Sequence, residues 1–147
     1  MKRVIAAAAI LSTFAGSIAL AQGKVPFPVK ARQGQMATMA MSLGVLGGMA
    51  QGKTEYDAAA AQAAANSLAG IAMIDPDILW QDGTAEGTAS LPAIWDDADA
   101  FAAEWAKFVA GAEKAVAEAG TGKDALGPIL GAVGGTCKSC HTSFRAK

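Results

Sequence analysis

Two cysteines and a histidine lie together near the C-terminus, in the run Cys137-Lys138-Ser139-Cys140-His141. These are the only cysteines and the only histidine of the chain. On a helix, Cys137 and Cys140 emerge from one face, and His141 lies on the same side. Thiols at this spacing reach the two vinyl groups of a haem, and the imidazole then lies beneath the iron. The run therefore predicts one covalently bound haem c, attached through both cysteines, with His141 as an iron ligand.

Two other kinds of site use the same residue types. A disulfide between two cysteines is common in exported proteins, but it leaves the neighbouring histidine without a role. A zinc site needs a fourth ligand, and the chain has no further Cys or His, so a carboxylate or water would have to complete the site. We therefore favour covalent haem attachment, with the disulfide as the main alternative.

The N-terminus has the pattern of a secretory signal peptide. Lys2 and Arg3 precede an apolar run that ends in small residues at Ala21. We predict a signal peptide over residues 1–21 and a mature periplasmic domain over residues 22–147. Cleavage removes Lys2 and Arg3 from the 12 basic residues, which leaves 10 against 13 acidic ones and a net charge of −3. This charge argues against nucleic acid as a partner, and we expect no membrane span in the mature form.

Apolar residues recur at helical spacing in four segments, and no segment alternates as a strand does. The predicted helices cover about residues 29–50, 54–75, 90–116 and 126–144. We expect Thr54 and Ser90 to cap the second and third helices. A long connection lies before the third helix, and its Trp80 is a candidate to cover a haem edge. Short connections make neighbouring helices antiparallel, so the predicted fold is all-α, an up-down-up-down four-helix bundle with covalently bound haem c.

The mature chain resembles the class II c-type cytochromes, the family that contains cytochrome c′ and cytochrome c-556. The resemblance rests on the Cys-x-x-Cys-His run, on Phe144-Arg145, on Arg32-Gln33 ahead of Met36, and on Leu91-Pro92-Ala93-Ile94-Trp95. It implies that Arg32 and Gln33 lie near the haem propionates and that Arg145 lies close to the proximal ligand. It also implies that Met36 packs over the distal face of the haem.

The sixth coordination position of the iron decides the function. A single histidine excludes bis-histidine ligation, so the position holds a methionine sulfur, a weaker donor or nothing. We interpret Met36 as the sixth ligand, with Met39 one turn further along as the substitute. In the alternative interpretation Met36 only fills space, as methionine often does in cores.

His/Met ligation predicts a periplasmic monohaem cytochrome that carries single electrons between redox partner proteins. The alternative is a five-coordinate cytochrome c′ that binds nitric oxide or carbon monoxide at an open distal face. We do not expect an enzyme such as a peroxidase, because the chain has no second histidine to serve as a distal proton shuttle. The sequence leaves open the redox partners, the reduction potential, and whether the protein is a monomer or a homodimer.

Overall fold

A computed structural model describes residues 25–147 of the chain. The predicted signal peptide, residues 1–21, lies outside the described residues and stays a prediction. The described helices are α1 (Phe27–Ala50), α2 (Ala58–Ala72), the 3-10 helix η1 (Pro76–Ile78), α3 (Ala93–Asp96), α4 (Ala98–Glu118) and α5 (Lys123–Phe144). Residues 25–147 form no strand, only an isolated β-bridge between Ser90 and Arg145.

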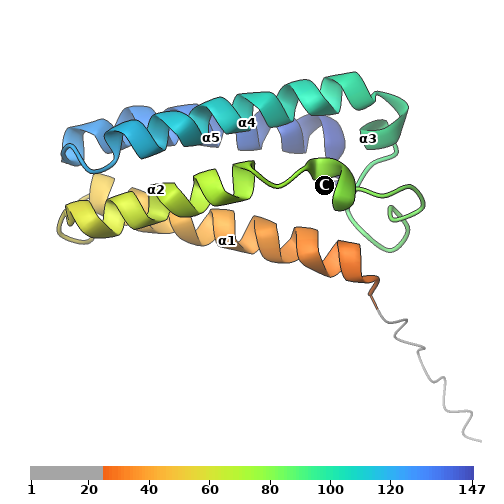
Figure 1. Ribbon diagram of the computed structural model, residues 1–147, viewed down its shortest axis with the longest axis horizontal. Helices are drawn as coiled ribbons and strands as arrows, with labels where there is room; N and C mark the ends of the chain where they lie inside the picture. The colour runs from red at the N-terminus through yellow and green to blue at the C-terminus, as the bar shows by residue number, and fades with distance from the viewer. Residues whose placement is uncertain (1–24) are drawn as a thin grey trace, which may run out of the picture.

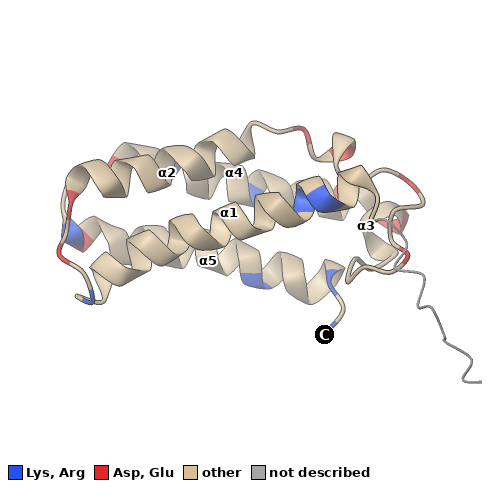
Figure 2. Ribbon diagram, turned by 90° about the horizontal axis from the view of Figure 1, so that it is seen from below, with Lys and Arg blue, Asp and Glu red and all other residues tan. Residues whose placement is uncertain are grey.

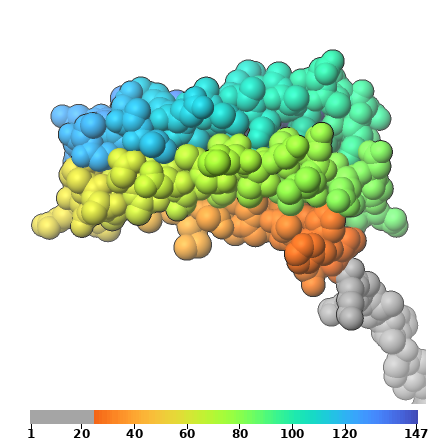
Figure 3. All heavy atoms as spheres, viewed as in Figure 1, coloured from red at the N-terminus to blue at the C-terminus, as the bar shows by residue number. Residues whose placement is uncertain are grey.

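The four long helices form the predicted bundle. Successive helices run in opposite directions along the molecule (Figure 1), and α1 packs on α2 and α5 while α4 packs on the same two helices. The connection between α2 and α4, which carries η1 and α3, crosses one end of the bundle. The atoms of residues 25–147 form an elongated body (Figure 3). The all-α, up-down-up-down prediction is confirmed.

The second helix begins later than the sequence indicates. Thr54 does not cap α2; its backbone N–H instead closes the turn after α1 on the Gly48 carbonyl, at 3.3 Å. Gly52 makes this turn with a φ of 70°, which favours glycine. The cap is Asp57, whose Oδ1 accepts a hydrogen bond from the backbone N–H of Ala60 at 2.9 Å.

The third predicted helix is two helices, α3 and α4, and Ser90 caps neither of them. The break lies at Asp97, where the backbone leaves the helical region with a φ of −133° and a ψ of 64°. The Asp97 side chain accepts from the Ala100 N–H at 3.2 Å and so caps α4. Beside Ser90, the Leu91 N–H donates to the Phe144 carbonyl at 3.0 Å, which ties the start of α3 to the end of α5.

The apolar core fills the bundle between the four helices. Its largest fully buried side chains are Val29, Leu46, Leu68, Leu126, Ile129 and Val133. Alanines on α2 and Gly111 on α4 let the helices approach closely. No helix within residues 25–147 has the length and apolar character needed to cross a membrane.

Candidate haem site

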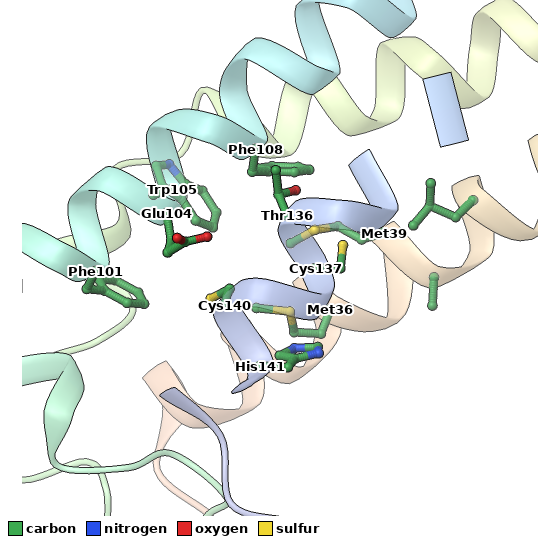
Figure 4. Close-up of a pocket in the computed structure, with 12 residues that line it drawn as sticks. Met36, Met39, Phe101, Glu104, Trp105, Phe108, Thr136, Cys137, Cys140 and His141 are labelled. Carbon is green, nitrogen blue, oxygen red and sulfur yellow. The ribbon is translucent and has the colours of Figure 1, made fainter. Parts of the chain in front are cut away.

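An apolar cavity of about 210 Å³ lies between α1, α4 and α5 (Figure 4). Its wall consists of Met36, Met39, Ala40, Leu43, Phe101, Glu104, Trp105, Phe108, Thr136, Cys137, Cys140 and His141. The cavity therefore brings together the candidate attachment cysteines, the candidate proximal histidine and the candidate distal methionine, which the chain separates by about a hundred positions.

Helix α5 presents Cys137, Cys140 and His141 to this cavity from its last two turns (Figure 4). Both cysteines are free thiols and partly buried. Burial raises the pKa of Cys137. Burial, the charge of Glu104 and the neighbouring Cys137 raise the pKa of Cys140 to about 11. The two cysteines are not joined in a disulfide in this structure.

The surroundings of His141 favour the neutral form of its imidazole. Partial desolvation and, to a smaller extent, the positive charge of Arg145 lower the pKa of His141. A lower pKa favours the neutral ring, which is the form that ligates a metal. Within residues 25–147, no three His, Cys, Asp or Glu side chains are grouped so that they could hold a metal ion.

A second cavity of about 440 Å³ continues from the first toward the α2–α4 connection. The two share Met36, Phe101, Cys140 and His141. The remaining wall of the second cavity is more polar and consists of Arg32, Gln33, Trp80, Thr88, Ala89, Ser90, Ile94, Phe144 and Arg145. The first cavity is apolar and suits the hydrophobic edge of a haem beside the cysteines. The second cavity carries cationic and amide groups and suits the propionate edge. The donor set and the cavity therefore fit haem c.

Helix α1 supplies the wall opposite α5. Met36 is half-buried and lines both cavities, and Met39, one turn further on, is buried in the core and lines the first. Met36 is therefore the better placed of the two methionines to face His141 across a haem. Whether its sulfur bonds to iron stays a prediction.

Arg32 has contacts that the sequence does not predict. It is buried, with 4% of its surface exposed. Its guanidinium donates to the Thr84 carbonyl at 2.5 Å, to Thr84 Oγ1 at 2.8 Å, and more weakly to the Leu79 carbonyl and Thr88 Oγ1, both at 3.4 Å. These hydrogen bonds hold the α2–α4 connection against α1. Its predicted role beside a propionate is an additional one and stays a prediction.

The other predicted polar residues lie at the second cavity. Gln33 and Arg145 are exposed and line it, as expected of groups near haem propionates and near His141. Trp80 also lines it, and it packs edge-on against Phe101 and Trp105, with ring centroids 5.1 and 5.9 Å apart. Trp80 is therefore in position to cover a haem edge.

The sequence analysis missed Glu104. It lies on the apolar stripe of α4, three residues after Phe101 and four before Phe108, and so faces the cavity with them. Its sequence position could have indicated a special role, because Glu104 is a charged residue on an apolar helix face. Such a residue is seldom buried without a specific partner.

Comparison with known proteins identifies the family. The family model described as Cytochrome C′ matches residues 28–145, nearly all of the described chain. The chain belongs to the cytochrome c′ family. A relative named cytochrome c′, from Cereibacter sphaeroides, is 40% identical, and the match covers 100% of this chain and 99% of that protein. As a member of this family, the chain is a monohaem c-type cytochrome, and its cofactor is covalently bound haem c.

Solved structures agree with this assignment. The cytochrome c′ described as from Rhodobacter Spheriodes matches with a TM-score of 0.77 and 43% identity, over 82% of this chain and 95% of that one. A variant of cytochrome c prime from Alcaligenes xylosoxidans, solved as its nitric oxide complex, matches with a TM-score of 0.73 and 33% identity, over 82% and 94% of the two chains. The family predicted from the sequence is confirmed.

Proposed function

We propose that this cytochrome binds nitric oxide or carbon monoxide at an open distal haem face. In this proposal Cys137 and Cys140 hold the haem, His141 is the single axial ligand from the protein, and Met36 packs over the opposite face. Haem c, held by these residues, would supply the iron that binds such a gas. The relative solved as its nitric oxide complex supports this function over the electron carrier that the sequence analysis preferred.

The observation that carries the proposal is the chemistry of the distal wall. In the first cavity α1 contributes Met36, Met39, Ala40 and Leu43, and none of these side chains has an N–H or O–H donor; Arg32 and Gln33 line only the second cavity. Distal polarity and hydrogen-bond donors decide between oxygen binding, oxygen activation and other functions of a haem. An apolar wall suits nitric oxide and carbon monoxide, which need no donor, and gives no proton to a bound peroxide. We therefore propose a binding protein and not an enzyme.

Electron transfer through a His/Met haem is the second candidate. It is supported by the position of Met36, which lines both cavities with His141. A thioether in this position is chemically able to ligate iron, and methionine also fills gaps of this kind without ligating. The two candidates differ in whether the sixth position is open, and spectroscopy distinguishes them directly.

The test is the absorption spectrum of the purified holoprotein in both oxidation states, followed by titration of the ferrous form with carbon monoxide. We expect a high-spin ferric spectrum. We also expect carbon monoxide to bind about tenfold more tightly in Met36→Ala, a gain of about 1.4 kcal/mol, because a smaller side chain relieves crowding over the iron. Met41→Ala is the control, since Met41 is on the same helix and 73% exposed.

The opposite outcome is equally clear. A low-spin ferric spectrum with the far-red band of methionine-ligated haem, lost in Met36→Ala and retained in Met41→Ala, would make Met36 the sixth ligand. The protein would then be the electron carrier.

We further propose that the protein works in the periplasm, which is consistent with the signal-peptide pattern of residues 1–21. Redox partner proteins and a homodimer stay predictions from the sequence.

A further inference from the structure

Glu104 places a carboxylate in the wall of an otherwise apolar cavity. Its side chain is 15% exposed and lines the cavity beside Cys140. Figure 4 shows it pointing from α4 into the space between α4 and α5, among Phe101, Trp105 and Thr136. Neither covalent attachment nor iron ligation uses this residue, so its position calls for another role.

Two hydrogen bonds hold the carboxylate in place. Ser139, the residue before Cys140, donates its hydroxyl to Glu104 Oε2 at 2.5 Å, and Lys107 Nζ donates to Oε1, also at 2.5 Å. The bond from Ser139 joins α4 to the segment of α5 that carries the cysteines. The hydrogen bonds from Lys107 and then Ser139 lower the pKa of Glu104, so the carboxylate is ionised at neutral pH.

Lys107 offsets the negative charge of Glu104 only in part. The Lys107 side chain is 59% exposed, and water and salt screen a cation in that position more strongly than they screen a carboxylate within the cavity wall. Glu104 lines the same cavity as Cys140, so its electric field acts across that cavity. A group bonded to Cys140 lies in the same field.

We propose that Glu104, held against the attachment segment by Ser139, tunes the haem by lowering its reduction potential. Oxidation adds one positive charge to the haem, and a fixed carboxylate in a medium of low dielectric constant stabilises that charge. Glu104 therefore favours the ferric state over the ferrous state. This inference rests on haem c in the cavity and is the same whether the sixth position of the iron is open or holds Met36.

The test is the midpoint potential of the holoprotein, measured by spectroelectrochemistry in Glu104→Gln. Glutamine keeps the size and the hydrogen-bond acceptor and removes the charge. We expect the potential to rise, and we expect the difference from wild type to persist at high salt because the site is screened less than the surface. Glu113→Gln is the matched control, an exposed acid on the same helix that lines a groove between α2 and α4, and we expect no shift from it.

A variant of opposite sign keeps the inference testable if Glu104→Gln does not fold. Lys107→Gln removes the cation that partly offsets Glu104, so we expect the potential to fall, by less than Glu104→Gln raises it. No shift in Glu104→Gln, or a shift of the same size in Glu113→Gln, would overturn the inference. A rise of the potential in Lys107→Gln would also overturn it.

Discussion

Arg32 shows what a single buried cation contributes to this site. The resemblance to class II cytochromes places it near a haem propionate, and the structure does place it in the wall of the second cavity. The guanidinium also donates four hydrogen bonds to the connection between α2 and α4. That connection carries Trp80, which lines the second cavity. The hydrogen bonds of Arg32 therefore help to position this part of the cavity wall.

We expect Arg32→Ala to lower the free energy of unfolding of the holoprotein by about 2 to 3 kcal/mol, because the substitution leaves the carbonyls of Leu79 and Thr84 without their charged donor. Urea unfolding followed by circular dichroism measures the change. Lys30→Ala is the control on the same helix, and since Lys30 is exposed its effect should stay within about 0.5 kcal/mol. Equal effects of the two substitutions would show that the contacts of Arg32 contribute no stability.

At the scale of the element, the packing of α4 against α5 positions the attachment cysteines. Gly111 on α4 faces Val133 on α5, and a Cβ at Gly111 would lie 3.2 Å from Val133 Cγ2 and 3.5 Å from Val133 Cα. Val133 precedes Cys137 by one turn. The close approach at Gly111 therefore fixes how near the cysteines of α5 lie to the aromatic side chains of α4.

We expect Gly111→Val to destabilise the holoprotein by about 1 to 3 kcal/mol, because the new side chain meets the Val133 backbone as well as its side chain. Gly131→Ala is the matched control: Gly131 is an exposed helical glycine, and a Cβ added there would meet no atom of another segment within 4 Å. Alanine there should stabilise by about 0.5 to 1 kcal/mol through helix propensity. Thermal unfolding of both variants measures the difference, and a neutral Gly111→Val would show that α4 and α5 separate at low cost.

At the scale of the whole molecule, the charges are unevenly distributed. Residues 54–106 contain no Lys or Arg, and their acidic residues gather at the α3 end and in the connections (Figure 2). Lys30 and Arg32 lie near the start of α1 and Lys138 near the end of α5, and Arg32 and Arg145 line the second cavity. We predict that the two arginines pair with the haem propionates.

Intact-mass spectrometry of the protein purified from a periplasmic fraction tests the processing and loading of the chain together. We expect the mass of residues 22–147 plus one haem, because cleavage follows Ala21 and both thiols are consumed as thioethers. The double variant Cys137→Ser with Cys140→Ser should give the mass of the same residues without haem. Retention of residues 1–21, or an unmodified wild-type chain, would contradict the prediction.

Local features of the sequence were enough to predict much of this protein. The four helices follow from apolar periodicity, and the haem follows from Cys137, Cys140 and His141, since attachment depends on their spacing along one helix. The position of Met36 opposite α5 came from the family resemblance. The family and the bundle are confirmed, while the roles of the individual site residues stay predictions.

Tertiary structure decided what depends on contacts between distant segments. Asp57 and Asp97 each cap a helix by accepting a hydrogen bond from the backbone N–H three residues later, and apolar periodicity does not show which of several polar residues will be the cap. The partners of Arg32 lie about fifty positions away, and Glu104 meets Ser139 only because α4 packs on α5. The sequence by itself determined which groups are present and which helix carries each; their environment, and hence the field at the haem, exists only once the helices pack together.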